Sequence, residues 1–188
     1  MIKLLTWQEL GLKPHVLVLI ALAAVIGVYL LILSRREKRE KDAATEQVRV
    51  LTADKLAAIP DDQLVDSVIR NLLAKLDEHR PDPYRDIPLL GEGRCAVYSV
   101  WVIEHEWRAG GFGALLRGTS AKFVPLAADG LRLLGATACA EQLDAAAALP
   151  PEQRKQADAA FGEALEREQP LTLCVAYIRD NSGQFIDN

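Results

Sequence analysis

The longest apolar run in the chain covers residues 16–33, eighteen residues without a charge, an amide or a proline. Thirteen of these eighteen residues are Leu, Ile or Val. As a helix the run is about 27 Å long, close to the roughly 30 Å of a bilayer's hydrocarbon core. The alternatives are a buried helix of a soluble core and a cleaved signal peptide, but the charged residues at 34–39 are typical of a stop signal and not of a cleavage site. The pattern therefore predicts a transmembrane helix over residues 15–34.

Charges on the two sides of this run predict its orientation. Two basic residues precede it and five follow it, namely Lys3 and Lys13 before it, and Arg35, Arg36, Lys38, Arg39 and Lys41 after it. Lys and Arg accumulate on the cytoplasmic side of a span. We therefore expect a single-pass protein of the inner (plasma) membrane, with the short segment 1–14 outside. Residues 35–47 are expected to form a charged stalk, and residues 48–188 a cytoplasmic domain.

Two helices are predicted directly after the stalk. A short one lies between Thr52, its expected cap, and Pro60, which ends it. The next has apolar residues every three or four positions over about four turns, at Leu64, Val65, Val68, Ile69, Leu72, Leu73 and Leu76. Asp61 or Asp62 is its expected N-cap. It is expected to stop at residues 80–83, because a residue before proline avoids helical geometry, and a loop is expected from there through residue 93.

Residues 94–107 form the most apolar stretch of the predicted soluble domain, and their apolar side chains cover most of a helix's circumference. Helices that are apolar all round are buried. We therefore expect a central core helix that ends at Gly110 and Gly111, where glycine permits the positive φ of a helix C-terminus. The β-branched residues of this stretch would also suit a buried strand, which is the alternative.

The rest of the chain predicts five further helical segments. They are residues 112–117, 121–134 with Pro125 in the first turn, 137–149, 152–168 and 171–178. The last has the composition of a strand, but no second convincing strand exists to pair with it, so a helix is expected. The predicted fold is all-α, with a single transmembrane helix followed by a helical-bundle-like soluble domain at residues 48–188.

Composition narrows the range of functions. From residue 43 onward the chain has fifteen basic and twenty-two acidic residues, the opposite of the balance in a nucleic-acid binder, so no direct nucleic-acid binding is expected. The three cysteines, Cys95, Cys139 and Cys174, have none of the paired spacings that bind metal. We interpret them as small core residues in a reducing compartment, and we expect no metal and no cofactor.

Glu104-His105-Glu106 is the one place where a histidine lies between two carboxylates in the sequence. A helical zinc hydrolase needs two histidines four residues apart, and Glu104 and Glu106 lie about 200° apart around a helix. We therefore predict no catalytic residue, and expect one or two of these groups to cap or form a salt bridge at a nearby helix end, with Arg108 as a candidate partner. An undetected hydrolase or transferase is an alternative that needs one pocket gathering Glu104 or Glu106, His105 and Arg108.

The glycine-rich sequence Gly110-Gly111-Phe112-Gly113 has some likeness to a phosphate-binding loop. It follows a predicted helix and not a strand, and it lacks both the P-loop lysine and the glycine spacing of dinucleotide-binding loops. We interpret it as a tight turn between helices.

Three segments and a C-terminal tail occur in a characteristic order. They are Tyr98-Ser99-Val100-Trp101-Val102-Ile103-Glu104-His105-Glu106, Gly110-Gly111-Phe112, Ala127-Ala128-Asp129-Gly130-Leu131-Arg132-Leu133-Leu134-Gly135-Ala136, and Tyr177-Ile178-Arg179-Asp180-Asn181 with Phe185. Together they resemble the all-helical family of the neisserial DNA-mimic protein, over roughly residues 51–186. The resemblance implies an all-helical domain, with a helix at residues 171–178.

For function, the resemblance implies a helical protein-binding module. Together with the predicted anchor and the lack of a predicted catalytic residue, it leads us to expect a non-enzymatic module at the cytoplasmic face of the bilayer, with an unidentified protein partner. The mimic captures a DNA-binding protein through acidic surface residues, so a tethered DNA mimic or an immunity-type inhibitor is the alternative. By analogy, the candidate partner-binding residues are Glu106, Arg108, Gly110, Gly111, Phe112 and Arg117. Around the glycine pair, where the family has asparagines and a glutamine with aromatic residues, this chain has Arg108-Ala109, Gly113-Ala114-Leu115-Leu116 and Gly118.

Overall fold

The computed structural model describes residues 22–23, 26–27, 29–31, 33–36, 45–76 and 82–187. The chain divides into two compact units, residues 1–44 and residues 45–188. Within these described ranges, no helix is both long enough and apolar enough to cross a membrane. All of the segment 1–14, and most of the predicted span and stalk, lie outside them, so the membrane anchor and its orientation stay predictions.

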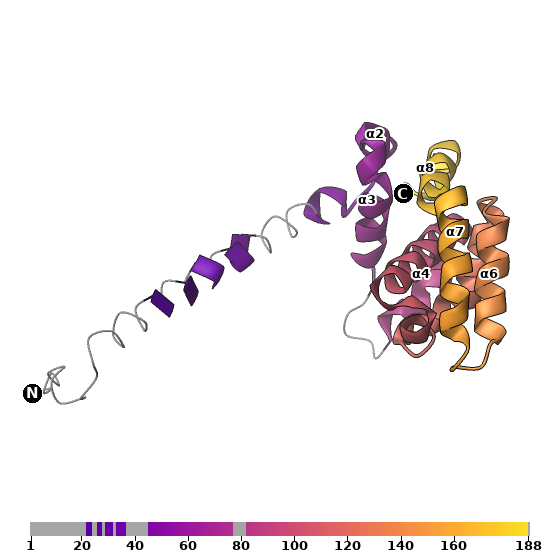
Figure 1. Ribbon diagram of the computed structural model, residues 1–188. Coiled ribbons are helices and arrows are strands. Elements are labelled where there is room, and N and C mark those ends of the chain that lie inside the picture. Colours follow the sequence, from indigo (N-terminus) through magenta and orange to yellow (C-terminus); the bar gives the residue numbers. More distant parts are fainter. Residues whose placement is uncertain are drawn as a thin grey trace, which may run out of the picture. The chain divides into compact units, whose positions relative to one another are not determined.

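In the described part of the second unit every regular element is a helix (Figure 1). The α-helices are α2 (Ala53–Ala58), α3 (Asp61–Leu73), α4 (Glu92–Leu115), α5 (Val124–Leu133), α6 (Thr137–Ala148), α7 (Asp158–Glu168) and α8 (Pro170–Asp180). The 3-10 helices are η2 (Pro83–Leu90), η3 (Thr119–Phe123), η4 (Arg154–Ala157) and η5 (Ser182–Gln184). The all-α prediction for this unit is confirmed.

Helix α4 is the centre of the fold, as its apolar circumference predicts. It packs against α3, α5 and α8 and against η2, η3 and η4. Val97, Val100 and Ile103 are buried on it. Its approach to α5 is close, because a Cβ atom at Gly130 would lie 3.0 Å from the Cα atom of Ala96. The strand alternative for residues 94–107 is wrong, because these residues lie in α4. A single strand among helices would also have no neighbouring strand to pair its backbone N–H and C=O groups.

The starts of the first two helices show one prediction confirmed and one corrected. Thr52 caps α2, where its Oγ1 accepts a hydrogen bond from the backbone N–H of Lys55 at 3.3 Å. At α3, however, neither aspartate is the N-cap; Pro60 takes that position, and Asp61 lies in the first turn. The carboxylate of Asp61 instead accepts hydrogen bonds from Arg179 of α8, at 3.0 Å from Nε and 2.6 Å from Nη2.

The loop predicted through residue 93 is largely helical. Pro83 begins η2, and α4 starts at Glu92, two residues earlier than expected. Arg94 is buried within the first turns of α4, where its Nε donates to the carbonyl oxygen of Gln184 at 2.9 Å. This contact joins residues ninety positions apart in the chain, so local spacing does not reveal it.

The later helices follow the predicted order with shifted starts. Gly110 and Gly111 break α4 as predicted, and the short segment after them continues to Leu115. Helices α5 and α7 begin later than expected, because 3-10 turns η3 and η4 occupy the residues before them. Residues 171–178 lie in α8, which buries Cys174 and Ile178, so the helix prediction is confirmed and the strand alternative is wrong.

One partly buried charge cluster fastens the C-terminal tail to the rest of the unit. Asp187 Oδ2 accepts hydrogen bonds from the N–H of Leu51 and from Asn71 Nδ2, both at 2.9 Å, and lies 2.8 Å from Lys75 Nζ. Asp187 Oδ1 lies 2.9 Å from Arg94 Nη2. Burial alone would raise the pKa of Asp187, but these donors outweigh burial and hold that pKa well below its usual range.

Candidate functional site

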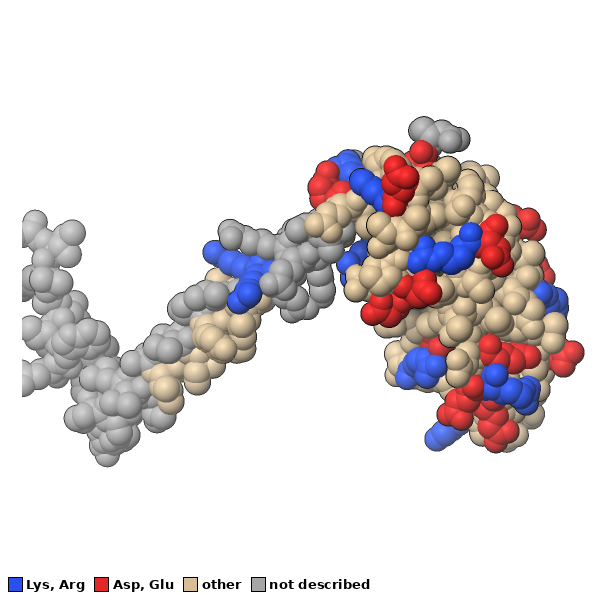
Figure 2. Space-filling view, turned by 90° about the horizontal axis from the view of Figure 1, so that it is seen from above, with Lys and Arg blue, Asp and Glu red and all other residues tan. Residues whose placement is uncertain are grey.

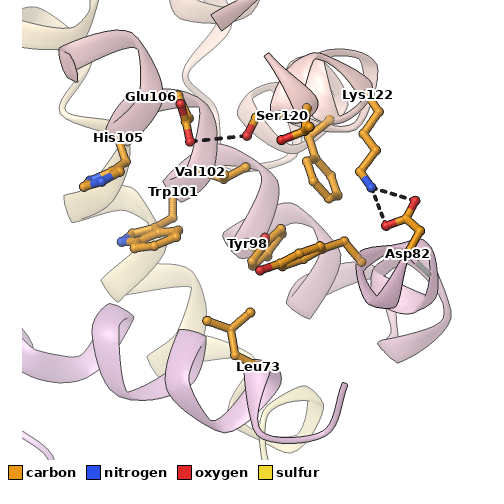
Figure 3. A pocket seen from close by; sticks show the side chains of 12 residues that line it. Leu73, Asp82, Tyr98, Trp101, Val102, His105, Glu106, Ser120 and Lys122 are labelled. Carbon is orange, nitrogen blue, oxygen red and sulfur yellow. Dashed lines mark hydrogen bonds and ion pairs between the residues drawn. The ribbon is translucent and has the colours of Figure 1, made fainter. Parts of the chain in front are cut away.

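A pocket of about 720 Å³ lies between α4, η2 and η3 (Figure 3). We call it the aromatic pocket. Its lining residues are Leu73, Asp82, Tyr84, Tyr98, Trp101, Val102, His105, Glu106, Thr119, Ser120, Lys122 and Phe123. Five of them come from α4, at spacings of three and four residues that place them on one face of that helix. The pocket therefore depends on the straight part of α4 before the break.

Aromatic rings form most of the floor of the aromatic pocket. The Tyr98 ring centroid lies 5.2 Å from that of Phe123 in an edge-to-face arrangement and 6.3 Å from that of Trp101. The His105 ring is stacked on Trp101 with 5.4 Å between centroids and 7° between planes (Figure 3). Such rings offer a large apolar contact area that costs little side-chain entropy on binding.

Charged and hydroxyl groups lie at the rim. Lys122 Nζ contacts both carboxylate oxygens of Asp82 at 2.6 and 2.8 Å, and it lies 5.5 Å from the ring centroid of Tyr84. Ser120 Oγ donates to Glu106 Oε1 at 3.3 Å. A ligand in this pocket would therefore meet an apolar floor and a polar edge, the usual arrangement of a binding site.

Tyr98 is a neutral donor in this setting. Burial raises the pKa of its hydroxyl, and the nearby Tyr84 and Glu106 raise it further when they are ionised. The phenol therefore stays protonated across the physiological range. Tyr98 is suited to packing and hydrogen bonding, and not to acting as a base.

Two further hollows continue from the aromatic pocket, one beside it and one beyond that. One of about 490 Å³ is lined by Trp101 together with Asp61, Asp62, Val65, Asp66, Leu171, Thr172 and Val175. Another of about 410 Å³ is lined by Leu171 and Thr172 together with Glu104, Arg108, Leu165, Glu166 and Gln169. Trp101 lines both the aromatic pocket and the 490 Å³ hollow, and Leu171 and Thr172 line both the 490 Å³ and the 410 Å³ hollows. The three therefore form a row, which we call the α4 groove.

Three of the six predicted partner-binding residues carry a charge on the surface. Arg108 donates from Nη2 to Glu104 Oε1 at 2.7 Å, which confirms the predicted salt bridge. Glu106 is half-buried at the rim of the aromatic pocket, and Arg117 is exposed after the end of α4. The structure brings Glu106 and Arg108 to two different hollows of the α4 groove and not to one site.

The other three predicted residues form the break in α4. Gly110 is exposed, and Gly111 has φ +64° and ψ −175°, angles open to glycine alone. Phe112 is fully buried, with its ring centroid 5.0 Å from that of Phe161, so its side chain belongs to the core and offers no surface to a partner. Partner binding at this turn stays a prediction, and the part of Phe112 in it would be to stabilise the turn and not to contact the partner.

The groups that the hydrolase alternative needs in one pocket are divided between two. Glu104 and Arg108 line one hollow, whereas His105 and Glu106 line the aromatic pocket. Within the described ranges, no three His, Cys, Asp or Glu side chains are grouped so that they hold a metal ion. The absence of enzymatic activity stays a prediction.

The cysteines lie as expected of small core residues. Cys139 and Cys174 are buried free thiols, and Cys95 is half-buried. Burial first, and nearby carboxylates second, raise the pKa of Cys139 and of Cys174 to about 12. Both therefore stay protonated at neutral pH, which makes them poor nucleophiles.

The sequence prediction included Glu106 and Arg108 but missed the aromatic residues that form the floor of the aromatic pocket. Tyr98 and Trp101 were assigned to the core. The spacing of Trp101 and His105, four residues apart on α4, places their rings on the same face of the helix. Tyr84 and Phe123 come from segments predicted as loop and as helix, and only tertiary contact brings them to α4. This spacing of ring-bearing side chains was the one local signal in the sequence that could have indicated the pocket.

Comparison with known proteins gives one match. No curated protein matches the chain significantly, and no solved structure does. A family match covers α4 through the end of α8, the elements that supply most of the α4 groove. Over residues 89–181 the chain is similar to the family described as DMP19-like protein.

Proposed function

We propose that residues 45–188 form a non-enzymatic protein-interaction module, which the apolar segment at 16–33 holds at the cytoplasmic face of a membrane. The observation that carries the proposal is the aromatic pocket, where Tyr84 is exposed and Trp101 is half-buried. Buried aromatic anchors and the pockets that receive them dominate the binding energy of many protein interfaces. Similarity to the DMP19-like protein family is compatible with a binding role.

The second candidate is a tethered DNA mimic, which the same family similarity supports. An effective mimic presents a continuous acidic surface to a DNA-binding protein. On the face seen in Figure 2, however, basic side chains are interspersed with acidic ones. Several of the acids are paired, among them Asp144 with Arg132 and Asp82 with Lys122. We therefore place protein binding through the α4 groove first.

The test is affinity capture from detergent-solubilised membranes with the full chain, comparing Trp101→Ala with the unaltered protein. Leu133→Ala on α5 is the matched control, because Leu133 is exposed and lies outside the α4 groove. Bound proteins are identified by mass spectrometry, and the unfolding midpoint of each variant is measured to confirm that it is folded.

The proposal predicts a protein that is captured by the unaltered chain and by Leu133→Ala but lost with Trp101→Ala. A captured DNA-binding regulator that duplex DNA displaces, and that Trp101→Ala retains, would instead favour the mimic. Turnover of a substrate by the purified chain would contradict the non-enzymatic proposal.

A further inference from the structure

The α4 groove is acidic along its whole length. Seven carboxylates line its three hollows, against one lysine and one arginine. Both cations are already engaged, Lys122 with Asp82 and Arg108 with Glu104. Asp61 is paired with Arg179. Of the seven, therefore, four have no salt bridge within the described ranges: Asp62, Asp66, Glu106 and Glu166.

Asp62 and Asp66 lie four residues apart on α3, so they share one face of that helix. Both are exposed, and they flank the hollow that also contains Val65 and Val175. Glu166 of α7 lies at the opposite end of the groove, beside Leu165 and Leu171. Each hollow thus combines an apolar wall with at least one carboxylate available to a ligand.

Glu104 adds a second and independent observation. Its side chain is 7% exposed, and both Arg108 donors, Nε at 3.0 Å and Nη2 at 2.7 Å, reach the same oxygen, Oε1. In the described part of the chain, Glu104 Oε2 is buried and accepts no hydrogen bond. An unsatisfied buried carboxylate oxygen is unfavourable, and its negative charge, which Arg108 balances only at Oε1, adds to the negative potential beside this hollow.

From these observations we infer that the α4 groove binds a cationic amphipathic segment of a partner protein, with an apolar residue in the aromatic pocket and Lys or Arg side chains beside Asp62, Asp66 and Glu166. The inference rests on the proposed function and specifies the partner's chemistry. Charge complementarity selects a cationic over an anionic segment, and the apolar floor selects a protein segment over a free polyamine.

The probe is a pair of synthetic peptides of about twelve residues. One has Lys and Leu arranged at helical spacing, and its counterpart has Glu in place of each Lys. The full chain is studied in uncharged dodecyl maltoside micelles with 5-fluorotryptophan at its three tryptophans, Trp7, Trp101 and Trp107. Fluorine NMR signals are assigned with single Trp→Phe variants. Because each tryptophan reports its own surroundings, binding at Trp101 is separated from peptide adsorption to the micelle.

The inference predicts a saturable shift of the Trp101 signal with the Lys peptide and none with the Glu peptide. The Trp107 signal should stay unchanged, because that indole packs on Phe161 and donates to Asp158, outside the groove. The triple variant Asp62→Asn, Asp66→Asn, Glu166→Gln should weaken the Lys peptide about tenfold, as expected for three partly exposed ion pairs.

The matched control is Asp54→Asn, Glu141→Gln, Glu163→Gln, which removes the same charge from exposed positions outside the groove and should leave the affinity unchanged. Equal responses to the two peptides, or equal weakening by the two triple variants, would overturn the inference. If the captured partner depends on Trp101 but not on the three groove carboxylates, the proposed function stands and the inference fails.

Discussion

Asp158 Oδ1 accepts a hydrogen bond from the backbone N–H of Phe112 at 2.8 Å. The same oxygen accepts from Trp107 Nε1 at 2.9 Å. Gly110 and Gly111 have non-helical backbone angles and break α4 directly before Phe112. The N–H of Phe112 therefore takes its acceptor from outside α4, the Asp158 carboxylate in the first turn of α7. One side chain thus fixes the bend in α4 and joins it to α7.

Asp158→Ala should destabilise the protein by about 1 to 3 kcal/mol, because it leaves the Phe112 N–H and the Trp107 indole N–H without their acceptor. The measurement is urea-induced unfolding followed by circular dichroism. Glu163→Ala on the same helix is the control, since Glu163 is exposed and should change little. Equal stability of the two variants would show that the carboxylate does not support the bend.

Gly111→Ala should also be destabilising, by about 1 to 3 kcal/mol, because its backbone angles belong to a region that only glycine occupies readily. A Cβ atom there would also lie 2.7 Å from Asp158 Oδ2. Gly113→Ala is the matched control two residues away, where the nearest atom to an added Cβ is at 3.9 Å. Thermal unfolding should show a lower midpoint for the first variant and an equal or higher one for the second.

The Asp187 cluster should make stability depend on pH. The folded pKa of Asp187 is held below its ordinary value, so the unfolded chain takes up a proton at this group at higher pH than the folded chain. Its contribution is present above the ordinary Asp pKa of about 4, and it is lost progressively as the pH falls from there toward the much lower folded pKa.

The measurement is the unfolding free energy at several pH values between about 7 and about 2. Asp187→Asn should be less stable than the unaltered protein at pH 7, and the difference between the two should shrink as the pH falls below about 4. A difference that stays constant with pH would indicate that the Asp187 charge is not what stabilises the tail.

The membrane proposal is tested by placing charge in the apolar segment. Leu22→Arg with Ile26→Arg should shift the full chain from the membrane to the soluble fraction, because each arginine costs about 2.5 to 3.5 kcal/mol near the centre of a span. Leu22→Ala with Ile26→Ala is the control and should stay in the membrane. The measurement is fractionation after alkaline extraction; retention of the arginine variant would argue against insertion.

Local sequence signals predicted most of the helices of the second unit. Apolar spacing in α3 and α4, Thr52 at the start of α2, and the glycine pair at the break of α4 all act through contacts within a few residues, so each is readable along the chain. The boundaries that differ, such as the start of α4 near Arg94, depend on partners as far away as Gln184.

By itself, the sequence determined the all-α class of the domain at residues 48–188 and the burial of α4, because helical periodicity and an apolar circumference are properties of one segment. Only the tertiary structure decided that Tyr84, Tyr98, Trp101 and Phe123 meet in one pocket, that Phe112 is a core residue, and that Asp158 holds the bend. These relationships join side chains from different helices, and their positions depend on how the helices pack, which no local pattern encodes.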